Sequence, residues 1–224
     1  WSVRRPHMPQ QGVSSGESDV YKEQAEMNAT TGVITGVAAG TATMTYTVVG
    51  TGGCPNATAT RTVTVTAAPV AGTLSGTQNV CVGLTTTFSS TQTGGSWSSS
   101  NTSIATINSN TGVITGVAAG TATMTYTGAG TGGCPNATAT RNLTVTAAVG
   151  AGTLSGTQKA CVGSKTKFSS TQTGGTWSSS NTAIATINAT TGVITGVAAG
   201  TATMTYTVVG TGGCPNATAT RTVT

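Results

Sequence analysis

The strongest constraint on this chain is an internal repeat with a period of 80 residues. Residues 28–64 and 188–224 are identical letter for letter, and 108–144 differs from them at six positions. The blocks that precede the second and third copies, 71–107 and 151–187, differ from each other at seven positions. A period this long exceeds that of solenoids, in which each repeat is one supersecondary unit. The chain is therefore expected to be an array of small, similar domains.

The repeat divides the chain into four segments. Two complete modules are expected at 68–147 and 148–224, and 28–67 corresponds to the second half of a third module. Residues 1–27 match nothing in the repeat and carry all four acidic residues. We expect this first segment to be poorly ordered and not to rebuild the missing half-module, which would leave 28–67 with open sheet edges. The incomplete module is either a truncated reading frame or is completed by a strand from another chain.

Each module alternates polar and apolar residues in the manner of β-strands. Between residues 121 and 127, Ala, Met and Tyr alternate with threonines, and 138–146 alternates likewise. Glycine-rich segments such as 94–95 and 130–133 separate the alternating runs. About seven short strands with turn signals between them predict an all-β sandwich for each module.

Two motifs in each complete module resemble the bacterial group-2 Ig-like domain, whose pattern is tWsSsnpsvAtv followed by GvvtgvaaGtatit. The first motif spans 97–107 and the second spans 111–126. Both recur within 177–206, and the second also occurs at 31–46. The resemblance implies tandem Ig-like β-sandwiches of the kind found in intimin- and invasin-type surface proteins, and it implies no catalytic residues.

The position of the tryptophans within these motifs predicts that they are core residues. We expect Trp97 and Trp177 to pack on the sheets that carry Tyr126 and Tyr206, respectively. Each complete module contains one Trp, one Phe and one Tyr, so the expected core is thin. Small domains with thin cores are often stabilised by disulfides.

The five cysteines follow the repeat. Cys81 and Cys134 are 53 residues apart, as are Cys161 and Cys214, and we expect one disulfide within each complete module. The repeat provides no partner for Cys54, which is therefore expected to be an unpaired thiol. Disulfides persist in oxidising compartments, which favours an extracellular or cell-surface location. The cysteines do not form the closely spaced pairs typical of zinc sites, so no metal site is expected.

Charged residues are scarce and unevenly placed. They make up 6% of the chain, and no Asp or Glu occurs from residue 28 onward. General acid–base catalysis needs positioned carboxylates or histidines, and calcium sites need several carboxylate oxygens, so we expect neither in the modules. The net charge of +5 comes without a dense Lys/Arg cluster, which argues against nucleic acid binding. No long apolar run or signal peptide is visible, and neither membrane insertion nor a cofactor is expected.

The Asn-Ala-Thr triplets are a further repeated feature. They begin at Asn28, Asn56, Asn136, Asn188 and Asn216. In a secreted eukaryotic protein they would indicate glycosylation acceptors. In a bacterial chain we interpret these asparagines as turn-forming residues.

Together these patterns favour a structural spacer or stalk in a secreted or cell-surface bacterial adhesin-like protein. An unknown surface ligand, protein or glycan, would be bound by other parts of the parent protein. The main alternative is a carbohydrate-binding accessory module of a secreted protein, and a third possibility is a virion decoration protein. Exposure of Trp97 and Trp177 would favour carbohydrate binding, whereas their burial would favour the spacer.

Overall fold

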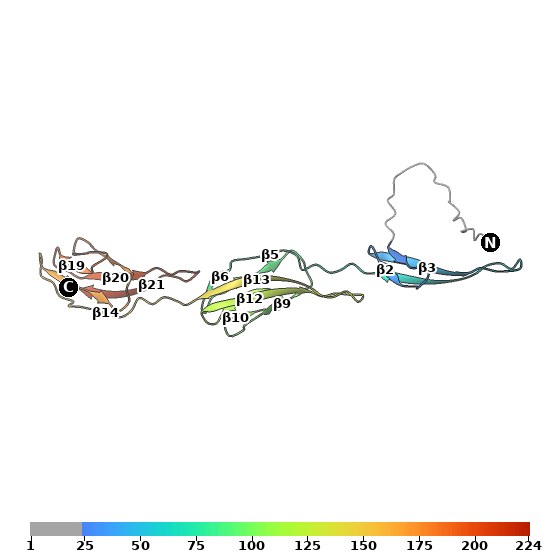
Figure 1. The fold of residues 1–224 in the computed structure, drawn as a ribbon. Coiled ribbons are helices and arrows are strands. Elements are labelled where there is room, and N and C mark those ends of the chain that lie inside the picture. The colour runs from blue at the N-terminus through green and yellow to red at the C-terminus, as the bar shows by residue number, and fades with distance from the viewer. Residues whose placement is uncertain (1–23) are drawn as a thin grey trace, which may run out of the picture. The chain divides into compact units, whose positions relative to one another are not determined.

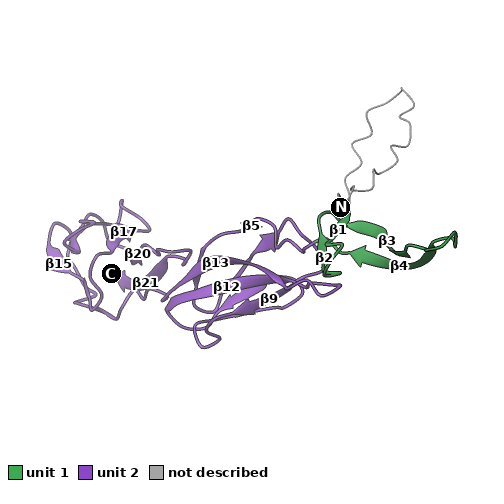
Figure 2. Ribbon diagram, turned by 45° about the vertical axis from the view of Figure 1, so that its right-hand side comes forward, with its two compact units in different colours: residues 1–67 green, residues 68–224 purple. Residues whose placement is uncertain are grey.

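The computed structural model describes residues 24–224, in which every regular element is a β-strand (Figure 1). The all-β fold expected from the sequence is confirmed. The chain divides into two compact units, 1–67 and 68–224 (Figure 2), and the boundary falls at the expected start of the first complete module. Residues 1–23, most of the segment expected to be poorly ordered, lie outside the described residues. Between residues 24 and 224 no helix has the length and apolarity needed to cross a bilayer.

The module at 68–147 is a sandwich of two main sheets. One sheet has the order β6-β13-β12-β9, and the other has the order β10-β11-β7. A short pair, β5-β8, completes the module. In chain order, the strands are β5 (Leu74–Ser75), β6 (Asn79–Cys81), β7 (Thr85–Thr87), β8 (Ser89–Ser90), β9 (Ser96–Ser99), β10 (Ala105–Ile107), β11 (Val113–Gly116), β12 (Gly120–Gly128) and β13 (Ala137–Thr146).

The module at 148–224 repeats this arrangement with one difference. Its sheets have the orders β17-β20-β21 and β15-β19-β18, with the short pair β14-β16. The strands are β14 (Leu154–Ser155), β15 (Lys165–Lys167), β16 (Ser169–Ser170), β17 (Thr176–Ser179), β18 (Ala185–Ile187), β19 (Val193–Gly196), β20 (Ala202–Val208) and β21 (Ala217–Val223). At the position of β6, residues 159–161 form no strand, although the amide of Ala160 still donates to the carbonyl oxygen of Thr224 at 3.0 Å.

The two-residue period of the sequence decides which side chains form the core. Along β12, Ala122, Met124 and Tyr126 are buried and the intervening threonines are not. The same alternation buries every second residue of β20. A slip of one residue would turn the threonines inward, so burial fixes the register of each central hairpin.

The first unit contains half of such a sandwich. Its strands are β1 (Ala25–Met27), β2 (Ile34–Gly36), β3 (Gly40–Val48) and β4 (Ala57–Val65). Strands β3 and β4 pair in the same register as β12 and β13, so Tyr46 stands opposite Ala59 as Tyr126 stands opposite Ala139. Among the described residues of this unit, no strand corresponds to β5–β9 of the complete module.

One expectation about the first segment is wrong. Residues 25–27 do form a strand, and Ala25 pairs with Gly36 as Ala105 pairs with Gly116 in the complete module. The repeat in structure therefore starts before the repeat in sequence. Ladder hydrogen bonds use backbone groups alone, so three residues outside the repeated sequence can still take the place of β10.

Candidate functional site

The tryptophans lie inside the modules. Trp97 and Trp177 are 7% and 6% exposed. Trp97 stands directly opposite Tyr126 in the β9–β12 pair, and their ring centroids are 5.0 Å apart. The two rings are therefore neighbours within one sheet, not partners from facing sheets. Trp97 also approaches Phe88, with ring centroids 6.4 Å apart.

The tyrosine hydroxyl holds the loop that leads into the tryptophan strand. Tyr126 Oη donates to the carbonyl oxygen of Gln92 and accepts from the amide of Gly95, both at 2.8 Å. A Cβ atom at Gly95 would lie 2.5 Å from Tyr126 Cζ, so only glycine allows this approach. Tyr206 makes the equivalent bonds to Gln172 and Gly175. The aromatic residues of the complete modules are thus committed to the core and offer no exposed platform.

Sequence reasoning assigned no role to the repeated arginines, and the structure gives them one. Arg141 lies over the ring of Phe88, with the guanidinium carbon 5.4 Å from the centroid. Its two terminal nitrogens donate to the carbonyl oxygens of Leu74 and Gly76 at 3.2 and 2.8 Å. Arg221 repeats all of these contacts in the next module. The two arginine side chains thus connect an edge segment to the central hairpin in each module. A cation–aromatic contact of this kind stabilises the fold.

The asparagines of the repeat form turns, as their interpretation from the sequence suggested. Asn108 Oδ1 accepts from the amides of Asn110 and Thr111 at 3.0 Å. Asn136 Oδ1 accepts from the amide of Gly130 at 2.9 Å and closes the loop between β12 and β13.

A disulfide joins the two complete modules. Cys81, at the end of β6, is bonded to Cys214, in the β20–β21 loop of the following module, and the two are 133 positions apart in sequence. Their Cα atoms are 4.7 Å apart. The expected pairing of Cys81 with Cys134 and of Cys161 with Cys214 is therefore wrong.

The central hairpin is too long for the two cysteines of one module to meet. Cys81 stands beside Thr146 at the end of β13, whereas Cys134 precedes the start of that strand. Strand β13 has 10 residues, which at about 3.3 Å per residue is about 30 Å. A disulfide spans Cα atoms no more than about 7 Å apart, so the two cysteines of one module cannot meet. Cys54 and Cys161 are exposed thiols outside the disulfide.

We call the loop at 210–215 the tip loop. We call the segment that it contacts, the end of β6 together with the linker after β13, its socket. The sulfur of Cys214 lies 3.5 Å from the carbonyl oxygens of Thr146 and Ala147. A Cβ at Gly212 would lie 2.1 Å from Thr146 Oγ1, and one at Gly213 would lie 3.4 Å from the carbonyl oxygen of Asn79. The paired glycines let the loop backbone lie directly against the neighbouring module, next to the disulfide.

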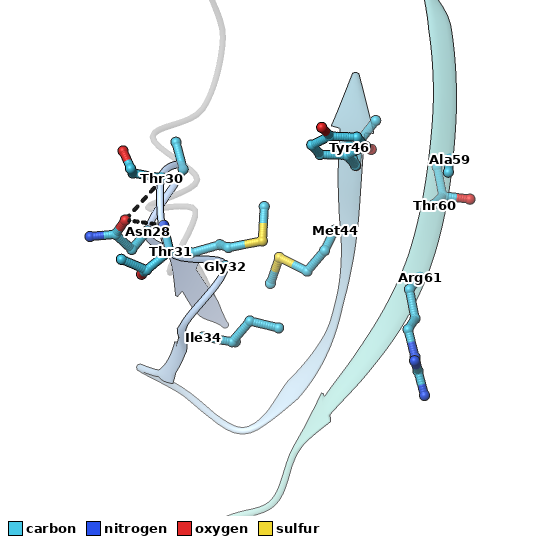
Figure 3. Close-up of a pocket in the computed structure, with 13 residues that line it drawn as sticks. Asn28, Thr30, Thr31, Gly32, Ile34, Met44, Tyr46, Ala59, Thr60 and Arg61 are labelled. Carbon is cyan, nitrogen blue, oxygen red and sulfur yellow. Dashed lines mark hydrogen bonds between the residues drawn. The ribbon is translucent and has the colours of Figure 1, made fainter. Parts of the chain in front are cut away.

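A second candidate is the uncovered face of the first unit (Figure 3). Met27, Ile34, Met44 and Tyr46 line a hollow of about 500 Å³ on the side where the complete modules carry their core. Tyr46 is 69% exposed, whereas its counterpart Tyr126 is 4% exposed. Figure 3 shows the side chains of Ile34 and Met44 pointing into the space between their strands. This face is a half-core whose covering segment is not among the described residues of the unit.

Residues 24–224 bring together no group of three or more His, Cys, Asp and Glu side chains that could hold a metal ion. The hydroxyls of Ser and Thr at the module surfaces bond to turns and strand edges, as Ser90 does to the carbonyl oxygen of Ala71 at 2.8 Å. Residues 24–224 thus form a scaffold with one disulfide between modules and one open apolar face.

Comparison with known proteins identifies the kind of module. Residues 59–134 match the bacterial Ig-like domain (group 2) family, a range that begins in β4 and ends in the β12–β13 loop. The resemblance found in the sequence is thereby confirmed over the matched residues. No curated protein matches the chain in sequence.

Two solved structures show a general likeness to the chain. One is the C-terminal 282-residue fragment of intimin in complex with the translocated intimin receptor intimin-binding domain, with 16% identity and a TM-score of 0.40. That likeness covers 66% of this chain and 62% of the intimin fragment. The other is a SusE-like surface-located polysaccharide-binding protein from the Bacteroides thetaiotaomicron heparin utilisation locus, with 14% identity and a TM-score of 0.28. That likeness covers 90% of this chain and 41% of the polysaccharide-binding protein.

Proposed function

We propose that this chain is a spacer segment of a secreted or cell-surface bacterial adhesin-like protein, and that it has no catalytic role. The observation that carries the proposal is the Cys81–Cys214 disulfide between neighbouring modules. A binding or catalytic module needs a site of its own, whereas a spacer needs modules that keep a defined geometry to one another. A covalent bond between modules serves the second need.

The joint adds a second connection to the one that the chain itself provides. Two modules connected only by the linker at 147–152 could bend at its glycines, Gly150 and Gly152. The disulfide ties the tip loop of one module to the socket of the other at a separate point. With two attachments, rotation about the linker is restricted, and the spacing between modules is kept under load.

The residue types of the modules support a role without catalysis. From Asn28 onward the chain has no Asp, Glu or His, the side chains on which general acid–base catalysis relies most. The disulfide supports an oxidising location, either extracellular or at the cell surface. We place the ligand, a protein or a glycan, on other parts of the parent protein.

The carbohydrate-binding alternative loses its main argument. It required exposed tryptophans, and both Trp97 and Trp177 are buried. Burial of the aromatic residues was the condition that favoured the spacer.

The test is whether the two complete modules tumble together. In the full chain, ¹⁵N relaxation should give 68–147 and 148–224 one common rotational correlation time in the oxidised protein. Cys81→Ser should separate the two values and shorten both, while Cys54→Ser, outside the joint, should change neither. Independent tumbling of the oxidised modules, or specific binding of a glycan by this chain, would contradict the spacer role.

A further inference from the structure

The open face of the first unit repeats a surface whose covering segment is known from the complete modules. The repeat places Met44 and Tyr46 where the complete module has Met124 and Tyr126, and strands β3 and β4 keep the register of β12 and β13. In the complete module this face is covered by 71–100, the segment that contains β5 to β9. We call this segment the first half of the module. The complete modules therefore show which kind of segment fits the uncovered face.

Both sheets of the first unit also have an edge with which a first half would pair. In the complete module, β12 pairs with β9 and β11 pairs with β7. Among residues 24–224, the counterparts β3 and β2 each pair with one strand only, β4 and β1, respectively. Open strand edges present backbone donors and acceptors to which a further strand can bind.

Two polar side chains of the open face have partners in the complete module that they lack here. Tyr126 and Arg141 hold the first half of their module through three of its backbone carbonyl oxygens. Their counterparts Tyr46 and Arg61 line the hollow and make no such hydrogen bond within residues 24–224. The face therefore offers hydrogen-bond donors for the backbone of an extended segment as well as apolar contacts.

The residues that precede the first unit differ from a first half in sequence. At the positions that correspond to Phe88 and Trp97, the chain has Met8 and Glu17. Two further positions, which correspond to residues in β7 and β8, are prolines, and proline cannot donate to a strand ladder. The lack of a first half is thus a property of the sequence at 1–27 and does not depend on where the chain begins.

The segment that follows the first unit is tethered too closely to cover it. In the complete module, the first half is entered from Val70, beside the start of β13, and a Cβ at Gly128 would lie 3.2 Å from the carbonyl oxygen of Val70. The module ends at Thr146, at the other end of β13, which at about 3.3 Å per residue is about 30 Å away. For 71–100 to cover the first unit in the same arrangement, residues 67–70 would have to bridge that distance, and four residues reach at most about 14 Å.

We propose that the first unit takes an unpaired first half of this repeat from another polypeptide, and that the two chains together complete one sandwich module. The occupant is an extended segment with Phe and Trp nine positions apart, as Phe88 and Trp97 are. The first halves of a second copy of this chain are already paired within their own modules, so a second copy is not the occupant. Binding would occur by addition of strands to open sheet edges. The inference does not depend on the spacer role.

The first experiment uses the full chain and a synthetic peptide of residues 71–100 that carries Cys81→Ser. The fluorescence anisotropy of the labelled peptide should rise on binding and saturate at one peptide per chain. Tyr46→Ala in the full chain should weaken binding by about 10-fold or more, because it removes the contact with Trp97 of the peptide. Thr43→Ala, a matched change on the other face of β3, should leave the affinity unchanged.

A disulfide trap tests the register of the bound peptide. Thr125 lies opposite Ser98 in the β12–β9 pair, and the counterpart of Thr125 in the first unit is Thr45. The full chain with Thr45→Cys and the same peptide with Ser98→Cys should form a link between positions 45 and 98 in a glutathione buffer. Opposed residues have Cα atoms about 4.5–5.5 Å apart, which a disulfide can span. The exposed thiols of Cys54 and Cys161 serve as internal controls and should capture little of the peptide.

The other outcomes would overturn the proposal. A full chain that does not bind the peptide would have its open face occupied from within the same chain. Self-association of the full chain that Tyr46→Ala abolishes would mean that a second copy is the occupant. Links spread evenly over positions 45, 54 and 161 would show contact without a defined register. Independent tumbling of the complete modules would count against the proposed function alone, because the Cys81–Cys214 bond takes no part in this binding.

Discussion

At the scale of single residues, the repeat places the same side chain in different surroundings. Tyr46 and Tyr126 occupy equivalent positions on equivalent strands, but Tyr46 lies on the open face and Tyr126 is buried beside Trp97. The difference arises from what covers each strand and not from the strand itself. Equivalent substitutions in the two units therefore measure the contribution of tertiary packing alone.

The tyrosine pair gives the first prediction. Tyr126→Ala removes the contact with Trp97 and two hydrogen bonds, and it should cost about 3–5 kcal/mol of the free energy of unfolding of its module. Tyr46→Ala should change the free energy of unfolding by no more than about 0.5 kcal/mol. Urea unfolding of the full chain, followed by tryptophan fluorescence and by circular dichroism, measures both. Equal losses in the two variants would show that the first unit has a covered core.

At the scale of elements, the central hairpins are constant and their loops differ in what they touch. Strands β3–β4, β12–β13 and β20–β21 keep the same residue pairs throughout. The loop of the last hairpin is seated on the preceding module, through Gly212 and Cys214. The local sequence determines the conformation of the loop, and the neighbouring module provides the surface that the loop contacts.

A glycine pair tests the joint at this scale. Gly212 and Gly52 have φ angles of 61° and 66°, so alanine strains the backbone equally at both. At position 212 the new Cβ would also lie 2.9 Å from Thr146 Cβ, whereas at position 52 it would meet nothing within 4 Å. Overpacking costs about 1–3 kcal/mol, which is roughly a 5- to 150-fold shift toward the reduced thiols.

The measurement is the oxidised fraction of Cys81 and Cys214 across a series of glutathione buffers. Gly212→Ala should shift the midpoint toward more oxidising buffers, and Gly52→Ala should leave it in place. An unchanged midpoint in Gly212→Ala would mean that the loop is held by the sulfur bond alone, without close seating on the socket.

At the scale of the whole molecule, the two units share sequence but differ in how that sequence is packed. Residues 28–64 and 188–224 are identical, but the second block belongs to a complete module and the first to a half-sandwich. Met204, in the second block, is fully buried, whereas its counterpart Met44 lines the hollow of the first unit. Local opening is easier where fewer apolar contacts hold a hairpin.

Hydrogen exchange should reveal this difference within single peptides. A peptic peptide from the shared sequence has the same mass from either site, so both sites contribute to one isotope envelope. We expect two populations of equal size, the faster from 40–48 and the slower from 200–208, read by mass spectrometry of the full chain. A single envelope at all times would mean that the first unit is as well protected as the complete module.

Much of the architecture could be predicted because it depends on local pattern. Alternation of threonine with Ala, Met and Tyr predicts strands and their buried face, and the identical blocks predict identical hairpins. The turn role of Asn108 follows from its side chain, which bonds to backbone amides two and three residues away. The strand at 25–27 escaped prediction because it is only three residues long: Ala25 and Met27 alternate with Glu26 as in a strand, but so short a run is not distinctive.

The sequence by itself determined the repeat, the all-β class, the inward-facing residues and the lack of acidic groups in the modules. Only the tertiary structure decided how the cysteines pair and what covers each face. The spacing between the two cysteines is the same in both complete modules. It does not indicate at which end of the sandwich each cysteine lies. The 10-residue strand β13 separates Cys81 from Cys134, and the following module brings Cys214 to Cys81. A contact between distant parts of a chain depends on strand length and direction in space, which periodicity alone does not encode.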